Sequence, residues 1–217
     1  MDIFYEKFGK ALKEVGIVPV IAVSNEAELE TLMSAVLQTP VKAIEITMRN
    51  EFAAKAIAEV KEKYPGTTVG AGTVVTEARL AEAKACGADF CVSPGLDTEI
   101  IKKAQAMTMP FLPGVCTPSE VLAANNLGLT TLKFFPAEAM GGADALKLYA
   151  GALADTVFIP TGGITMDNLG KYLSQKNVVA CGGSFMAPKS AVSGGEVDAI
   201  VKNIIKCINI CKESRGN

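Results

Sequence analysis

Short apolar runs alternate along the chain with longer segments in which apolar residues recur every three or four positions. The short runs are rich in β-branched residues and predict strands buried on both faces. The longer segments predict amphipathic helices. Eight strand–helix units follow one another, with strands at 17–23, 41–47, 67–73, 89–94, 110–115, 130–136, 156–163 and 178–184, and helices at 27–38, 51–64, 77–87, 97–107, 119–128, 143–153, 166–175 and 194–214.

Eight such units, with no linker and no shift in composition, favour one domain over residues 1–217. We predict an α/β fold, a single (β/α)8 TIM barrel. An open flavodoxin-like or Rossmann sheet is the alternative. The glycine signature G-x-G-x-x-G does not follow the first strand, where the sequence is AVSNEAE and Ser24 or Asn25 is typical of a helix N-cap.

A further helix is predicted before the first strand. Apolar residues recur there at spacings of three and four, at Phe4, Phe8, Ala11, Leu12 and Val15. We expect this extra N-terminal helix to cover the N-terminal end of the barrel.

Length and charge narrow the class of protein. The 217 residues are enough for one sizeable core and too few for two ordinary domains. The net charge of −2 and the absence of Lys/Arg clusters interleaved with aromatic residues give no support for nucleic acid binding. Charged residues interrupt the first segment, and no apolar run could span a bilayer, so we expect a cytoplasmic protein without a membrane partner.

Cysteine and histidine content limits the possible chemistry. The six cysteines form no C-x-x-C pair and are predicted to be reduced, buried thiols. The sequence has no histidine, which removes the commonest general base and the commonest catalytic zinc ligand. Acid–base chemistry therefore falls to carboxylate, Lys, Tyr or Cys, and we expect no metal site.

Polar residues and glycines concentrate where the predicted strands end. In a barrel of this kind the chemistry lies at the carboxyl ends of the strands. These ends carry Glu45, Thr47 and Arg49; Thr73; Ser93, Pro94 and Gly95; Pro113 and Gly114; Lys133; Thr161, Gly162 and Gly163; and Gly182, Gly183 and Ser184.

Two charged residues interrupt apolar strands. Lys133 lies between Leu132 and Phe134, where burial favours the neutral amine that attacks a ketone. Glu45 lies between two isoleucines, and pairing with Lys133 across the barrel would reduce the cost of burying it. The residues alone leave two interpretations open. Lys133 is either a solvent-reaching or ion-paired structural lysine, or a nucleophile for which Glu45 moves protons.

Arginine and glycine indicate anion binding at the same end. Arg49 follows the second strand, and its guanidinium suits a carboxylate such as that of a 2-oxo acid. Two glycine pairs end the last two strands, where backbone N–H groups commonly bind phosphate. The alternatives are a loop arginine without a specific role and two simple turns.

Segments of this sequence match a known family almost from end to end. I-E-I-T-x-R, G-A-G-T-V, K-F-F-P-A-E and P-T-G-G-I occur in this order, together with VPVIAV, VSPGL, FLPGVCTPSE and CGGS. With them the chain resembles the family of 2-keto-3-deoxy-6-phosphogluconate (KDPG) aldolase and 4-hydroxy-2-oxoglutarate (KHG) aldolase.

The resemblance implies a class I aldolase and assigns its site. Lys133 would form the Schiff base and Glu45 would be the acid–base residue. Arg49 and Thr73 would hold the pyruvate carboxylate and neighbouring oxygens, and Phe135 would pack near the imine. The remaining substrate-binding residues would be Pro94, Thr161, Gly162, Gly163, Gly183 and Ser184, with the glycines, Thr161 and Ser184 at the phosphate end.

The resemblance also implies a reaction and an assembly. The expected reaction cleaves KDPG to pyruvate and glyceraldehyde 3-phosphate, with KHG, which yields pyruvate and glyoxylate, as a second substrate. The partner would be a phosphorylated 2-oxo acid, without metal or organic cofactor, and the protein a homotrimer. Alternatives are an aldolase for the galactonate epimer, a sugar-phosphate epimerase, and a non-catalytic barrel that binds phosphate ligands.

Overall fold

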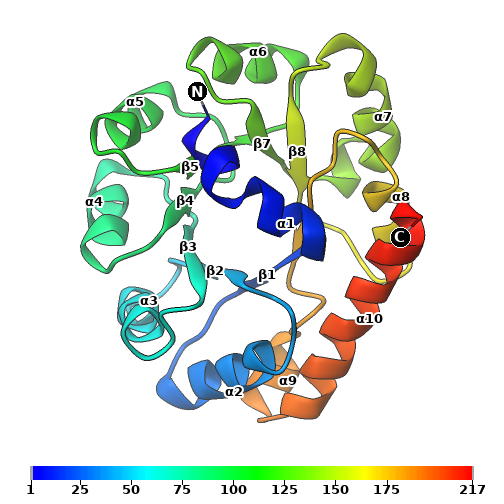
Figure 1. Cartoon of the computed structure of the whole chain (residues 1–217). Helices are drawn as coiled ribbons and strands as arrows, with labels where there is room; N and C mark the ends of the chain where they lie inside the picture. The colour runs from blue at the N-terminus through cyan, green and yellow to red at the C-terminus, as the bar shows by residue number, and fades with distance from the viewer. Residues whose placement is uncertain (1, 217) are drawn as a thin grey trace.

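Parallel strands form the centre of the molecule and helices surround them (Figure 1). The computed structural model describes residues 2–216. The strands are β1 (Ile17–Ile21), β2 (Ala43–Thr47), β3 (Thr68–Gly72), β4 (Phe90–Val92), β5 (Phe111–Leu112), β6 (Gly114–Val115), β7 (Thr131–Phe134), β8 (Val157–Pro160) and β9 (Cys181–Gly183). The helices are η1 (Tyr5–Gly9), α1 (Lys10–Val15), α2 (Glu26–Leu37), α3 (Phe52–Lys63), α4 (Glu77–Ala85), α5 (Thr98–Ala106), α6 (Pro118–Asn126), η2 (Glu138–Met140), α7 (Gly142–Ala152), α8 (Leu169–Leu173), α9 (Lys189–Ser193) and α10 (Val197–Arg215).

The strands pair in the order in which they occur in the chain. Six of them form a curled parallel sheet in the order β5-β4-β3-β2-β1-β9, and three form a second parallel sheet in the order β6-β7-β8. Each of β1 to β4 pairs with the next strand in the chain, so the order does not reverse as it does in a doubly wound sheet. The predicted α/β class and the predicted alternation of strands and helices are confirmed.

The two sheets meet at a proline. The predicted strand 110–115 is divided into β5 and β6 because Pro113 has no N–H to donate to a neighbouring strand. The carbonyl of Pro113 still accepts from the Lys133 N–H at 2.9 Å. On the far side, parallel bridges join Phe158 to Val178 and Thr161 to Gly182, which connects β8 to the β9 region.

Side-chain N-caps begin four of the helices that follow strands. Asn25 caps α2 by accepting from the Glu28 N–H, which confirms the predicted cap at this turn. Thr76 and Asp97 cap α4 and α5, and Thr117 forms a capping box with Glu120 at the start of α6. Each cap satisfies N–H groups that a helix start leaves unpaired, so the helices begin close to the strand ends.

The predicted N-terminal helix is present as η1 followed by α1, and α1 lies across the centre of the strands in Figure 1. Phe4 and Leu12 belong to a buried cluster with residues of several strands, Phe90 of β4 among them. Asp2 ties this segment to the first residue of β7 by accepting from the Thr131 N–H at 2.6 Å. A larger cluster lies between the strands and the outer helices.

Several other predicted segments differ from the structure. The strand 178–184 shrinks to the three residues of β9, and the helix 166–175 shrinks to α8. The helix expected over 194–214 begins at Val197 and is preceded by the separate helix α9. The helices α8 and α9 have five residues each, little more than one turn, and β9 has three, which is too few positions for a hydrophobic period to define them. No helix within residues 2–216 is long and apolar enough to cross a membrane.

Candidate active site

Lys133 lies inside the molecule on β7. Its neighbours Leu132 and Phe134 pack in the outer core beneath the helices, so the alternation of a strand turns Lys133 to the inner side. The residue is 6% exposed, and its cross-strand neighbours are Gly114 on β6 and Ile159 on β8. A buried amine without water needs an acceptor or an opposite charge.

Glu45 supplies that partner from β2. It is 5% exposed, and its Oε1 lies 3.4 Å from the Nζ of Lys133. The neighbouring strand makes room for the carboxyl group at Gly72, because a Cβ there would lie 2.9 Å from Glu45 Cδ and closer still to Oε1. The two residues are 88 positions apart in the sequence, and the sheet brings them together.

Phe135 lies beside the amine, and Pro94 packs against a cross-strand neighbour of Lys133. The Lys133 Nζ lies 5.5 Å from the centre of the Phe135 ring, within the range of a cation–π contact. Phe135 in turn approaches Gly162, where a Cβ would lie 3.3 Å from ring carbons. Pro94 packs against Gly114, the cross-strand neighbour of Lys133, so closely that a side chain on Gly114 would overlap the Pro94 carbonyl.

Arg49 and Thr73 form a second polar group at the ends of β2 and β3. The Arg49 Nε donates to Thr73 Oγ1 at 3.2 Å. Thr73 has φ +63°, a left-handed conformation that is strained for a β-branched residue. Arg79, to which sequence reasoning gave no role, donates to the carbonyl oxygens of Met48 and Thr73 and so fixes both loops.

A pocket of about 410 Å³ opens between the ends of β1, β2, β8 and β9. Of the predicted site residues, it is lined by Arg49, Thr161, Gly162, Gly163, Gly183 and Ser184. Lys133, Glu45, Thr73, Pro94 and Phe135 are not on its walls. Thr161 connects the two groups, since it lines this pocket and also a small internal cavity beside Glu45.

The glycine pair after β8 is held by a network that includes side chains without a predicted role. Gly162 and Gly163 have φ +99° and +78°, conformations that glycine adopts without strain. The Gly163 carbonyl accepts from Asn168 Nδ2 at 3.1 Å, and Asn168 also donates to Glu138. Glu138 could have been found from the sequence, because it ends the K-F-F-P-A-E segment that the family shares. No sequence motif pointed to Asn168.

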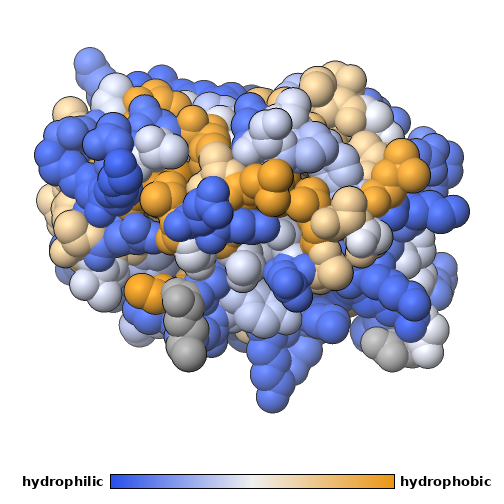
Figure 2. Space-filling view, turned by 90° about the horizontal axis from the view of Figure 1, so that it is seen from above, coloured by the Kyte–Doolittle hydropathy of each residue, from blue (hydrophilic) through white to orange (hydrophobic). Residues whose placement is uncertain are grey.

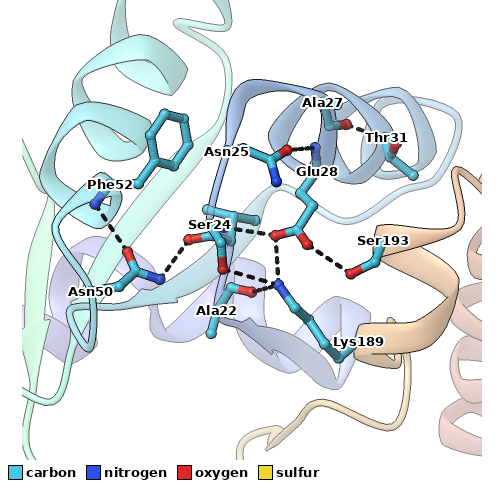
Figure 3. Close-up of polar contacts among 11 residues, drawn as sticks. Ala22, Ser24, Asn25, Ala27, Glu28, Thr31, Asn50, Phe52, Lys189 and Ser193 are labelled. Carbon is cyan, nitrogen blue, oxygen red and sulfur yellow. Dashed lines mark hydrogen bonds and ion pairs between the residues drawn. The ribbon is translucent and has the colours of Figure 1, made fainter.

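The rim of the pocket carries a second network that sequence reasoning missed. Lys189 Nζ contacts Glu28 Oε2 at 2.5 Å, and donates to Ser24 Oγ and the Ala22 carbonyl at 3.2 Å each (Figure 3). Ser193 donates to the other carboxylate oxygen of Glu28 at 2.7 Å. These contacts join α9 to the β1–α2 loop, elements more than 160 residues apart in the chain.

The cysteines lie away from this chemistry and are all free thiols, as predicted. Four are buried, while Cys86 and Cys116 are only partly buried, which corrects the prediction for those two. Burial raises the pKa of Cys91 to about 12, so this thiol stays protonated at neutral pH. Residues 2–216 contain no group of three or more His, Cys, Asp or Glu side chains placed to hold a metal ion.

Comparisons with known proteins agree on one family. The family model "KDPG and KHG aldolase" matches residues 9–203. The 2-dehydro-3-deoxy-phosphogluconate aldolase of Haemophilus influenzae is 39% identical over 201 residues, which cover 93% of this chain and 95% of that protein.

Two solved structures have the same fold. The KDPG aldolase of Legionella pneumophila, with pyruvate captured as a covalent carbinolamine intermediate, is 32% identical with a TM-score of 0.87, over 93% of this chain and 97% of that one. The 2-keto-3-deoxy-6-phosphogluconate aldolase of Zymomonas mobilis, with 3-phosphoglycerate, is 33% identical with a TM-score of 0.85, over 91% and 93%. This chain therefore belongs to the KDPG and KHG aldolase family.

Proposed function

We propose that this chain is a class I aldolase, a lyase that cleaves KDPG to pyruvate and glyceraldehyde 3-phosphate through a Schiff base on Lys133. The observation that carries the proposal is the buried amine of Lys133 with Glu45 Oε1 at 3.4 Å. A carbinolamine is the adduct of an amine with a ketone, and the Legionella relative was captured with pyruvate in that form. KHG is the second candidate substrate, because the matched family includes KHG aldolase.

The reaction begins with proton transfer inside this pair. When Glu45 accepts a proton from the Lys133 ammonium group, the neutral amine adds to the C2 ketone of the substrate. Glu45 then returns that proton to the carbinolamine hydroxyl, which leaves as water, so an iminium ion forms and Glu45 is a carboxylate again. A carboxylate within reach of the amine is what a site without histidine needs for these transfers.

The iminium ion then accepts the electrons of the broken bond. Glu45, as carboxylate, removes the proton of the C4 hydroxyl through a water molecule, and the C3–C4 bond breaks. Its electron pair moves into the iminium to give an enamine, and glyceraldehyde 3-phosphate leaves. The enamine is protonated at C3, and water hydrolyses the resulting imine to pyruvate and free Lys133.

The surrounding residues would orient the substrate between two anion sites. Arg49 would bind the carboxylate, with Thr73 beside it, since a guanidinium pairs with a carboxylate through two hydrogen bonds. Phe135 and Pro94 would shield the imine from water. Backbone N–H groups of Gly162, Gly163, Gly183 and Ser184, with the Thr161 hydroxyl, would bind the phosphate, as glycine-rich loops at strand ends commonly do.

Borohydride reduction in the presence of pyruvate tests the proposal. Intact mass and peptide mapping should show a reduced pyruvyl adduct on Lys133, and the Lys133→Met variant should show none. Lys61→Met is the matched control, because Lys61 also forms a partly buried ion pair, 2.8 Å from Asp89, and its loss should leave the adduct intact. An adduct on another lysine, or none at all, would favour a barrel that only binds phosphate ligands.

We also propose that the strands close into one (β/α)8 barrel that forms a single domain. The division at Pro113 leaves β5 and β6 in one continuous segment, and the bridges from Phe158 and Thr161 reach the β9 region. Both features support closure of the two sheets at their edges. Such a barrel has no free strand edge on which other chains could pair.

We propose a homotrimer in the cytoplasm. Support for an assembly comes from large apolar side chains at the surface near α6 and α7: Leu148 is 76% exposed, Leu122 54% and Met140 39%. Figure 2, which looks onto the side of the molecule that carries α6, shows a band of hydrophobic residues across this face. Exposed apolar residues that cluster in this way mark protein interfaces.

A further inference from the structure

The pocket carries two cations and, among the residues 2–216 that line it, no carboxylate. The cations are Arg49 and Lys189. The proposed function assigns Arg49 to the carboxylate of the substrate, and it leaves Lys189 without a role. A second cation facing the pocket is suited to a second anionic group on the ligand.

Lys189 is fixed by its partners but remains accessible. Its side chain is 53% exposed, whereas that of Glu28 is 9% exposed. Glu28 is held from two further sides, by the Ser24 N–H at 2.7 Å and the Ser193 hydroxyl at 2.7 Å (Figure 3). Burial raises the pKa of Glu28, but these hydrogen bonds and the Lys189 ammonium outweigh it and hold the pKa below its usual value.

The ion pair between Lys189 and Glu28 presents its positive member to the pocket. Lys189 and Ser24 line the pocket and Glu28 does not, so the positive end of the pair faces the cavity. Ser24 Oγ accepts from Lys189 at 3.2 Å, and its own proton has no acceptor within the described part of the chain. An incoming anion would therefore meet one ammonium group and one free hydroxyl donor on this wall.

We propose that Lys189, with Ser24, determines the preference for a phosphorylated substrate by binding the phosphate group together with the glycine loops that line the same pocket. This inference rests on the proposed function and adds a residue that sets its substrate class. On binding, a phosphate oxygen replaces one of the two 3.2 Å contacts of Lys189, and the shorter contact with Glu28 keeps the ammonium in place. No covalent step is involved.

Comparison of two substrates that differ by the phosphate tests the inference. Lys189→Met should lower kcat/KM for KDPG about tenfold, through KM, and leave kcat/KM for 2-keto-3-deoxygluconate unchanged, since a partly exposed charge contributes modestly. Lys189→Arg should restore the preference. Lys55→Met is the matched control, because Lys55 pairs with Glu26 in the same first turn of α2 but does not line the pocket.

Two outcomes would overturn the inference. If Lys189→Met lowers kcat/KM equally for both substrates and also lowers the melting temperature, Lys189 has a structural role only. If the ratio of kcat/KM for KDPG to kcat/KM for 2-keto-3-deoxygluconate does not change in Lys189→Met, the phosphate is bound by the backbone groups without Lys189.

A measurement without turnover separates this inference from the proposed function. Inorganic phosphate should raise the melting temperature of the wild type more than that of Lys189→Met. If phosphate stabilises both equally, the inference is wrong, whatever borohydride trapping shows. If the wild type fails to trap pyruvate but its phosphate response depends on Lys189, the aldolase proposal fails and the anion site stands.

Discussion

Replacing Gly72 with alanine tests whether the position of the Glu45 carboxyl group controls the reaction. Gly72 ends β3 and is paired with Thr47 on β2, two residues beyond Glu45. Its backbone has no positive φ, so alanine introduces no conformational strain at this position. The added methyl group instead meets Glu45, at 2.9 Å from Cδ and Cγ and closer to Oε1.

The size of the effect follows from that overlap. Non-bonded carbons approach to about 3.5 Å, so Cδ must retreat by at least about 0.6 Å and Oε1 by about 1 Å. A displacement of about 1 Å at a reacting group can cost about a hundredfold in rate, which corresponds to about 2.7 kcal/mol in activation free energy. Since the carboxyl oxygen is the flexible end of its side chain, the cost in folding stability should be smaller than the cost in kcat.

Pyruvate release from KDPG, coupled to lactate dehydrogenase and followed by NADH absorbance, measures the effect. Gly72→Ala should lower kcat about a hundredfold and still form the borohydride adduct with pyruvate on long incubation. Gly66→Ala is the control, because a Cβ at Gly66 meets nothing within 4 Å. A Gly72→Ala enzyme with wild-type kcat would show that Glu45 does not act from the position seen here.

Three further predictions address the acid–base role, the pocket rim and the assembly. Glu45→Gln should still form the imine but turn over at least a hundredfold more slowly, by single-turnover kinetics; unchanged turnover would remove Glu45 from the mechanism. Because its contacts hold the pKa of Glu28 below its usual value, Glu28 should stabilise the fold above about pH 4.3, and this contribution should fade as pH falls through the lowered pKa. The unfolding free energies of wild type and Glu28→Gln in urea should therefore converge towards pH 3, and a constant difference would contradict the linkage. Leu148→Glu should weaken the proposed homotrimer in light scattering, whereas an unchanged molar mass would place the interface elsewhere.

Periodicity predicted the long elements well and the short ones poorly. Helices α2 to α5 span 9 to 12 residues, which gives enough positions for their hydrophobic patterns to define them. β9 and α8 were predicted longer than they are, and α9 was not predicted. The division at Pro113 was readable in principle, since a proline cannot donate within a sheet.

The sequence revealed those site residues whose charge is unusual among apolar neighbours. Lys133 and Glu45 stand out because a charge in an apolar strand is costly unless another residue compensates for it. Lys189 shows no such conflict. It is a surface lysine in a five-residue helix, and its partner Glu28 lies 161 positions away. No local pattern distinguishes it from the other exposed lysines.

The sequence by itself determined where most strands and helices lie, that histidine chemistry is impossible, and which two charges must be compensated inside the molecule. Those properties depend on neighbours within a few positions or on composition. Only the tertiary structure decided that Glu45 lies 3.4 Å from Lys133, that Gly72 leaves space for the carboxyl group, and that Lys189 faces the pocket with Glu28 behind it. Such distances result from sheet register and loop packing, where elements far apart in the chain meet and local preference carries no information.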